Sequence, residues 1–594
     1  MRTHSANTAT FCWIVAAVTA LALIPFLGET LFYSKGEPRE AIVAYTMLES
    51  GNWTLPFNYG TDMAYKPPFL YWCIASCATL LGDLSEFTSR LPSALAFLLM
   101  QVVFFQFVAR RRSVQQALVA SLLLLTCFEV HRAAVACRVD MVQVCFIVIA
   151  ICLLFRWDER GCRGVPWLAV LSMACATLTK GPVGSFLPCL VIGAYQLLRG
   201  RSFVKTFFSF VGIGLLTFIP YALWIWAAWH QGGEAFINLM LEENTGRLTG
   251  QMSYESHENP FWYNFLTLIW GWTPWTLLLP LALLNRRPRR TPAPRLKWME
   301  RLSNFWQDFL ELPPLTRLSW VVSVLIVLFY CIPKSKRSVY LLPVYPFMAL
   351  LMADYLLALA HQGARSLRIL IHILSGAALL LTVAFLSVRL GLVPESLMNS
   401  GRHAAENLAY LRALRDDVLP AWKVGITLLP AAAAIASIVL MRRQEQTPYR
   451  PLQAGLLTLT LFLALDSTYQ PLVLSTKSER PLARRIEQMW PEGPVYSFSK
   501  MSYYGVNYYL GDRMRHIEQE PPQDEALLLV SDKEEAAMQE ALTGDYSMEK
   551  LFRTDRRSCD MRSPINLYRI TKKWIPLPSS TDTTPSRTNC ATFC

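Results

Sequence analysis

The sequence predicts a polytopic α-helical membrane protein that carries a soluble α/β domain near its C-terminus. Of the 594 residues, 53% are hydrophobic and only 17% are charged, whereas about 25% are charged in an ordinary soluble domain. The apolar residues form blocks of about 20, such as 11–31 and 367–388, and each block is long enough to cross a hydrocarbon core about 30 Å thick. These observations argue against a soluble enzyme.

Thirteen apolar blocks are predicted to span the membrane. Basic residues recur in alternate connections between the blocks, and this pattern places those connections and the N-terminus inside the cell. The formal net charge of +13 therefore reflects topology and does not indicate nucleic-acid binding. Because thirteen is odd, the C-terminal region is expected outside. The predicted spans are 11–32, 87–108, 114–130, 141–156, 165–179, 183–198, 206–229, 262–284, 317–333, 339–360, 367–388, 422–441 and 452–472.

The domain organisation follows from where this pattern changes. Residues 1–475 hold all the spans, and their outer connections 33–87, 230–262 and 389–422 are too long for simple turns. Within the first connection, amphipathic stretches at 41–47 and 70–81 are expected to lie along the membrane surface. Short apolar runs then alternate with charged helical segments, which predicts an α/β domain over 476–575. The Ser/Thr/Pro-rich tail 576–594 is predicted to be disordered.

Four charged clusters fall on the predicted outer side: Gly36–Ala41, Tyr65–Pro68, Arg138–Asp140 and Lys334–Arg337. Ionisable residues beside spans need partners or a water-filled cavity. Carboxylates among several cations suit a reaction in which a carboxylate accepts a proton while cations neutralise a phosphate leaving group. The same lysines and arginines also fit simple snorkelling towards lipid phosphate, and the glutamates fit a solvated helix face. Asp140 is favoured because lipid headgroups do not attract a carboxylate.

Taken together, these motifs resemble the superfamily of lipid A aminoarabinose transferases and protein O-mannosyltransferases, which are glycosyltransferases of the GT-C fold. The resemblance implies transfer of one sugar from a polyprenyl-phosphate carrier to an acceptor. It also implies a multi-pass protein of the bacterial inner membrane whose active site and C-terminal domain face the periplasm. The similarity runs in order through Gly36–Ala41, Tyr65–Pro68, Arg138–Asp140, Leu178–Pro182, Glu258–Tyr263, Gly271–Trp275 and Lys334–Pro343.

The resemblance assigns roles to individual residues. Asp140 matches a catalytic aspartate of the family. In the first family motif, Asp-Glu-x-Arg-Tyr, Gly36 stands at the aspartate and Glu40 at the tyrosine, so Glu37 and Arg39 are the matching residues. Glu37 is therefore expected to supply the second catalytic carboxylate. Contacts to the carrier phosphate or substrate are expected from Lys66, Arg39, Arg247, Lys334, Lys336, Arg337, Tyr340, Tyr65 and Tyr263.

Metal dependence is left open. Aminoarabinose transferases have a glutamate before the Lys-Pro pair, where this chain has Tyr65. A divalent metal remains possible, but hard cations need several oxygen ligands and zinc needs three or four ligands. His257 is the weak candidate for a further ligand. No cofactor is otherwise expected, and the sequence contains no Gly-rich phosphate loop.

The expected mechanism is a single displacement in which Asp140 or Glu37 takes the acceptor proton and the carrier phosphate leaves. The acceptor is lipid A or another envelope glycolipid or glycan. An alternative is a protein O-glycosyltransferase that uses the same kind of donor. A different class is a transporter or flippase for lipid-linked sugars, which would favour repeat symmetry and charges near the bilayer midplane. A further alternative makes the C-terminal domain a binding module with a membrane anchor.

Overall fold

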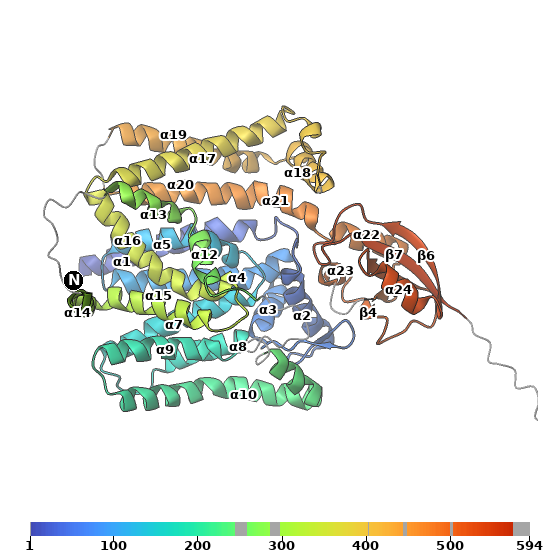
Figure 1. Cartoon of the computed structure of the whole chain (residues 1–594), viewed down its shortest axis with the longest axis horizontal. Coiled ribbons are helices and arrows are strands. Elements are labelled where there is room, and N and C mark those ends of the chain that lie inside the picture. Colours follow the sequence, from blue (N-terminus) through green and yellow to red (C-terminus); the bar gives the residue numbers. More distant parts are fainter. Residues whose placement is uncertain are drawn as a thin grey trace, which may run out of the picture.

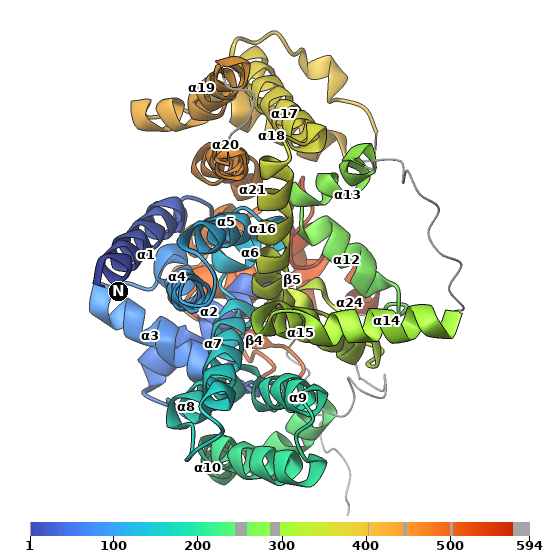
Figure 2. The ribbon, with the colours of Figure 1, turned by 90° about the vertical axis from the view of Figure 1, so that its left-hand side faces the viewer.

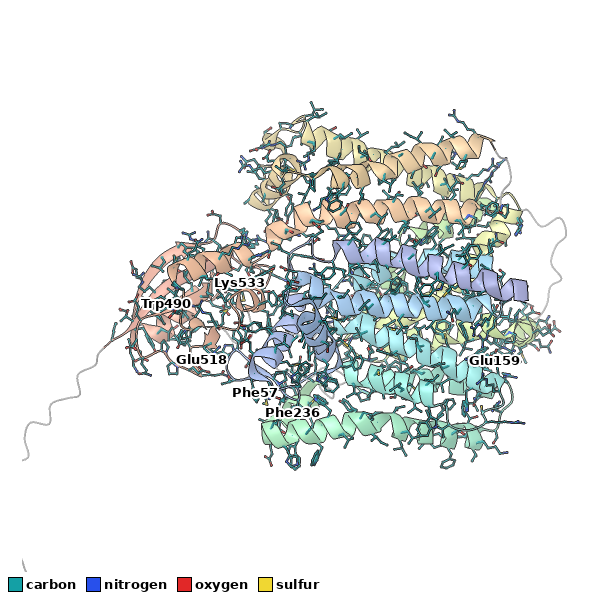
Figure 3. All side chains as sticks on the ribbon, turned by 180° about the vertical axis from the view of Figure 1, so that it is seen from behind. Phe57, Glu159, Phe236, Trp490, Glu518 and Lys533 are labelled. Carbon is teal, nitrogen blue, oxygen red and sulfur yellow. The ribbon has the colours of Figure 1, made fainter. Side chains whose placement is uncertain are left out.

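The computed structural model consists of a helical bundle with an α/β domain at one end (Figure 1). It describes residues 2–243, 258–285, 298–401, 403–443, 448–498 and 503–573, without the side chains of 2–7 and 443. We call the end of the bundle that carries the α/β domain the domain end. Glu159, the last residue of α7 (Val139–Glu159), lies at the opposite end, far from Phe57 and Trp490 (Figure 3).

The chain is a multi-pass membrane protein. In its described part, nine helices are long and apolar enough to span a membrane, and two bent pairs raise the number to eleven. The other two predicted spans form shorter helices, α8 and α9, so the total of thirteen stays a prediction. The long helices are α1 (Arg2–Leu23), α4 (Glu86–Ala109), α7, α10 (Phe203–Leu241), α15 (Pro314–Cys331), α16 (Tyr345–His361) with the preceding 3-10 turn η5 (Ser338–Val344), α17 (Arg365–Arg389), α19 (Ala421–Arg443) and the run from α20 (Arg450–Ala464) to Lys477.

Local sequence signals set many of the helix boundaries. Ser85 caps α4 by accepting a hydrogen bond from the Thr88 amide, and Ser113 caps α5 (Val114–Leu125) in the same way. Gly181 (φ +103°) and Pro182 separate α8 (Trp167–Lys180) from α9 (Val183–Leu198). The bent pairs join α5 to α6 (Phe128–Ala134) at 71° and α12 (Tyr263–Gly271) to residues 275–285 at 103°. The two bends lie against each other, because the Phe128 amide donates a hydrogen bond to the Thr273 carbonyl oxygen.

Two shorter helices, α2 (Gly36–Ser50) and α3 (Phe69–Leu81), lie at the domain end between the spans and the α/β domain (Figure 1). Gly51 and Gly82 end them in the left-handed conformation, with φ of +67° and +87°. The predicted amphipathic stretches 41–47 and 70–81 are therefore confirmed as helices. Between them lies a hairpin of β1 (Phe57–Asn58) and β2 (Asp62–Met63).

The C-terminal domain is confirmed as an α/β unit with a five-stranded mixed sheet of order β4-β3-β5-β7-β6. Strand β5, which is buried along its whole length, pairs in parallel with β3 and antiparallel with β7, where Ala526 faces Ile570. The predicted boundaries stay predictions, and the tail 576–594 lies outside the described residues. The remaining elements are β3 (Val495–Ser497), β4 (Met514–His516), β5 (Ala526–Ser531), β6 (Tyr546–Arg553), β7 (Ile565–Lys572), α22 (Arg480–Met489), α23 (Tyr504–Tyr509) and α24 (Glu535–Leu542).

One hydrophobic core joins this domain to the membrane part. Ile42, Val43 and Met47 of α2 are buried in the same cluster as Leu527 of β5 and Leu567 of β7. Polar contacts reinforce the joint on the hairpin. The Tyr503 amide donates to the Tyr59 hydroxyl at 3.0 Å, and the Tyr59 ring stacks on His516 with centroids 4.8 Å apart. The domain therefore fixes the position of α2, which carries the first charged motif.

Candidate functional site

Glu37 is held in a buried ion pair with Arg90 of α4. Its Oε1 and Oε2 accept hydrogen bonds from Arg90 at 2.8 and 3.1 Å, and Oε1 also accepts from the Cys137 amide at 3.0 Å. Arg90 donates further to the carbonyl oxygens of Leu27 and Thr30. Both side chains are at most 5% exposed. Both oxygens of Glu37 are therefore engaged in joining α2 to α4, and its expected role as a base stays a prediction.

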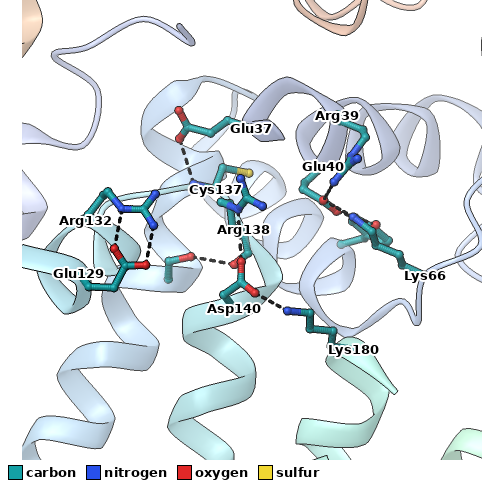
Figure 4. A network of polar contacts seen from close by, with 12 residues as sticks. Glu37, Arg39, Glu40, Lys66, Glu129, Arg132, Cys137, Arg138, Asp140 and Lys180 are labelled. Atoms are coloured by element: carbon teal, nitrogen blue, oxygen red, sulfur yellow. Dashed lines mark hydrogen bonds and ion pairs between the residues drawn. The ribbon is translucent and has the colours of Figure 1, made fainter. Parts of the chain in front are cut away.

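Glu40, one turn further along α2, occupies the charged site instead. Its Oε1 contacts the Lys66 ammonium and lies 3.1 Å from the Arg39 guanidinium, and its Oε2 accepts from the Tyr71 hydroxyl at 2.8 Å (Figure 4). Burial alone would raise the pKa of Glu40, but the positive charges of Lys66 and Arg39 outweigh it and lower the pKa to about 2. The side chain is 3% exposed and ionised.

Asp140 forms the second carboxylate centre at the first turn of α7. The Lys180 ammonium, from the last residue of α8, contacts its Oδ1, and Arg138 Nε lies 3.2 Å from its Oδ2 (Figure 4). Lys180 also lies over the Tyr340 ring, 4.7 Å from its centroid. Gly181 and Pro182 end α8 directly after Lys180, so Lys180 is the last residue of the helix and lies at the domain end. Asp140 is therefore close to both Lys180 and Arg138.

The glycine at position 36 explains how Arg138 fits. A Cβ atom at Gly36 would lie only 2.7 Å from Arg138 Nη1, so the guanidinium fills the space that a side chain there would enter. The aspartate of the related motif would occupy this space. The departure at Gly36 thus goes together with an arginine positioned beside Asp140.

Arg337 completes the site as a half-buried cation. Burial lowers its pKa, and the nearby Arg138 and Arg39 lower it further. Among the residues that the structure describes, no carboxylate forms an ion pair with Arg337. Five cations thus surround two carboxylates, which leaves an excess of three positive charges. We call this set the charged cluster: Arg39, Lys66, Arg138, Lys180, Arg337, Glu40 and Asp140.

Other predicted residues take different places. Lys336 is 5% exposed and donates to the Asn259 and Pro333 carbonyl oxygens, so its ammonium is engaged within a loop. Lys334 is exposed, whereas Tyr65, Tyr263 and Tyr340 are half-buried. Arg247 and His257 lie outside the described residues. Tyr65 lies near Arg39 and Tyr340 near Lys180, so both are at the charged cluster, and the ligand roles expected for all of these residues stay predictions.

The donor set does not fit a divalent metal well. The described residues contain no group of three or more His, Cys, Asp or Glu side chains that could hold an ion. In the charged cluster, each carboxylate is already neutralised by two cations, and their charges oppose entry of a divalent cation. The cluster instead suits an anionic group such as a phosphate.

Three members of the cluster were missed by sequence reasoning as site residues: Glu40, Lys180 and Arg138. Their motifs are visible, since Glu40 and Arg138 stand in two of the charged clusters and Lys180 precedes Gly181-Pro182 at the end of an apolar block. Which of two nearby glutamates faces the site, however, depends on Arg90 and Lys66, which lie far along the chain. Lys180 could have been predicted as a site residue, because the topology places it at the same face of the membrane as Asp140.

Comparison with known proteins places this geometry in context. Residues 65–226 match the family model for dolichyl-phosphate-mannose-protein mannosyltransferase. An undecaprenyl phosphate-α-4-amino-4-deoxy-L-arabinose arabinosyl transferase of Edwardsiella ictaluri is 28% identical over 386 residues, which cover 63% of this chain and 65% of the relative. The corresponding transferase 1 of Pseudomonas fluorescens is 31% identical over 329 residues, which cover 54% of this chain and 55% of the relative.

The fold agrees with that of a solved member of this group. The crystal structure of ArnT from Cupriavidus metallidurans bound to undecaprenyl phosphate has a TM-score of 0.64 and 19% identity, and the match covers 94% of this chain and 98% of ArnT. The predicted GT-C fold is therefore confirmed, and the chain is similar in sequence to the transferases named above. The matched segments span 65% and 55% of the two curated relatives' own lengths.

Proposed function

We propose that the chain is a glycosyltransferase that moves one sugar from a polyprenyl-phosphate carrier to lipid A or a related envelope glycolipid. The names of the similar proteins support this class of donor. The observation that carries the proposal is the charged cluster, in which Arg337 has no carboxylate partner among the described residues and sits with four other cations near Asp140. We place the protein in the bacterial inner membrane, with the domain end facing the periplasm.

The cations act on the phosphate of the donor. A polyprenyl phosphosugar is a phosphodiester with one negative charge, and its phosphate gains a second charge when the sugar departs. An excess of three positive charges favours the more charged leaving group, as electrostatic stabilisation of the transition state requires. Arg337 is available to the phosphate at once. Lys66 and Lys180 reach it by exchanging their contacts with Glu40 and Asp140.

This exchange links donor binding to the proton acceptor. While Lys66 and Arg39 neutralise Glu40, its low pKa makes it a poor base. A phosphate that attracts the same cations weakens their hold on the carboxylates and so raises their basicity. The acceptor hydroxyl then transfers its proton to Asp140 or Glu40. Its oxygen bonds to the anomeric carbon as the bond from that carbon to the phosphate oxygen breaks, and the phosphate keeps the electron pair. A single displacement of this kind inverts the anomeric centre.

Reconstitution tests the function directly. The purified chain in proteoliposomes is given undecaprenyl phosphate-linked aminoarabinose and lipid A, and mass spectrometry follows the product. We expect glycosylated lipid A with the wild type, and a turnover lower by about 10²–10⁴-fold with Asp140→Asn. Transfer to Ser or Thr of an added polypeptide, but not to lipid A, would support the protein O-glycosyltransferase alternative. Donor translocation without any transfer would support the transporter alternative, and either result would contradict the proposal.

A further inference from the structure

Helix α14 (Trp298–Glu311) separates its apolar and polar residues completely. At 3.6 residues per turn, its apolar side chains fall within an arc of about 140°, and its polar side chains fill the rest of the circumference. The helix has 14 residues and is thus about 21 Å long. The apolar arc consists of Trp298, Met299, Leu302, Phe305, Trp306, Phe309 and Leu310.

Most of this apolar arc is exposed. Trp298 is 72% exposed, Phe305 66% and Trp306 48%. Burying a large apolar side chain contributes about 1.5–3 kcal/mol, so an arc of this size in water is strongly unfavourable. Scattered exposed apolar residues need no explanation, but seven on one side of one helix indicate a binding face.

The position of α14 identifies the partner. The helix lies at the end of the bundle opposite the α/β domain (Figure 1) and runs across the ends of the spans, extending beyond the bundle (Figure 2). Its C-terminus is joined by Leu312 and Pro313 to α15, which begins at Pro314. An element that crosses the ends of membrane spans lies at the level of the lipid headgroups.

The orientation of the arc follows from Phe309, which lies near its middle. Phe309 packs against the hydrophobic core of the bundle, and the Trp306 ring stacks on it with centroids 5.7 Å apart. The apolar arc is therefore turned towards the bundle and not away from it. Where α14 extends beyond the bundle (Figure 2), the side chains of the arc are exposed. On α15, which follows in the chain, Trp320, Val324 and Leu328 are exposed as well.

We infer that α14 binds the bilayer surface as an in-plane helix, with its apolar arc among the upper acyl chains and its polar side in water. Tryptophan prefers this interfacial region, which suits Trp298 and Trp306. Helix α14 has one basic residue, Arg301, and three acidic residues, Glu300, Asp308 and Glu311. Its net charge is therefore negative, so the burial of apolar side chains drives the binding, and attraction to anionic lipid does not. This inference is independent of the proposed enzymatic function.

Photocrosslinking in proteoliposomes tests this orientation in the full-length chain. The photoreactive amino acid p-benzoylphenylalanine is introduced at Leu302 or Phe305 in the apolar arc, or at Asn304 on the polar side as the matched control. All three positions are exposed. After irradiation in vesicles of phosphatidylethanolamine and phosphatidylglycerol, mass spectrometry counts the lipid adducts. We expect several-fold more adduct at positions 302 and 305 than at 304.

Three outcomes would overturn the inference. Equal adduct yield at 304 and 305 would show that the helix has no fixed orientation at the surface. A crosslink from 302 or 305 to a second copy of the chain would identify a protein interface in place of lipid. No adduct at 302 and 305 would place the apolar arc in water. Tryptic mapping of each adduct to α14, together with an unchanged thermal unfolding temperature, ensures that the compared variants are folded.

Discussion

Replacing Glu40 by glutamine should slow sugar transfer while tightening the binding of the carrier phosphate. The amide keeps the size of the side chain and can still accept the hydrogen bond from Tyr71, but it removes the charge that holds Lys66 and Arg39. If Glu40 takes part in proton removal, kcat should fall by about 10²–10⁴-fold.

The effect on carrier binding has the opposite sign, because phosphate must compete with Glu40 for Lys66. A hydrogen bond to a charged group contributes about 1.5–3 kcal/mol when buried. The Lys66 side chain is 17% exposed, so we take the lower end of this range, about 1.5 kcal/mol. Releasing Lys66 should therefore lower the Kd for undecaprenyl phosphate about tenfold.

The assay measures both quantities on one preparation in nanodiscs: Kd for undecaprenyl phosphate from a binding titration, and kcat from product mass. Glu49→Gln is the matched control, because Glu49 lies on the same helix but is exposed and outside the charged cluster. Unchanged or weaker carrier binding by Glu40→Gln would refute the exchange of cations between carboxylate and phosphate. A kcat equal to that of the wild type would exclude Glu40 as the proton acceptor.

The remaining predictions concern the other charged groups. Lys66→Ala should weaken carrier binding by about 10- to 150-fold, whereas exposed Lys334→Ala should not; equal titrations for the two variants would exclude Lys66 as a ligand. Glu37→Gln leaves the buried Arg90 without its charged partner and should lower the free energy of unfolding by about 3–5 kcal/mol. The variant should show a lower Tm and a near-normal kcat in the folded protein. A normal Tm with a strongly reduced kcat would instead support Glu37 as a catalytic residue. Burial and then Glu479 raise the pKa of Asp560 to about 7, above about 3.9 in the unfolded chain, so the folded state binds the proton more tightly between these values. The free energy of unfolding should therefore fall as pH rises from about 4 to 7, by at most about 1.4 kcal/mol per pH unit. Asp560→Asn should flatten this dependence in thermal unfolding, and an unchanged slope would contradict the assignment.

The sequence predicts the membrane architecture well because apolar length is a local property. Each predicted span coincides with a helix or a bent helix pair, and the segment 476–575, where short apolar runs predict strands, contains β3, β5 and β7. Bends are harder to predict. The 71° turn between α5 and α6 depends on packing, including the hydrogen bond from the Phe128 amide to the Thr273 carbonyl of a distant segment.

Site prediction succeeds where one residue has one plausible partner region and fails where tertiary contacts choose between neighbours. Lys66 and Asp140 are brought to one cluster as expected, because their motifs lie at the same membrane face. Glu37 and Glu40 are three residues apart on one short helix, and local sequence treats them alike. Arg90, which is buried in α4, forms an ion pair with Glu37, and Lys66 forms an ion pair with Glu40. Lys336 likewise donates a hydrogen bond to the Asn259 carbonyl oxygen, a contact that no local sequence pattern predicts.

The α/β domain is a continuous segment of the chain, but it shares its hydrophobic core with α2 and therefore cannot be separated from the membrane part without opening that core. Ile42, Val43 and Met47 supply part of its interior from the first outer connection, more than 400 residues before β3. A fragment comprising the sheet alone would leave the face that normally receives these side chains open to water. Conversely, loss of the domain would expose Ile42, Val43 and Met47 on the helix that also carries Glu40. The soluble part thus supports α2 from outside the membrane, and substitutions in its sheet should perturb the charged cluster without changing any residue of that cluster.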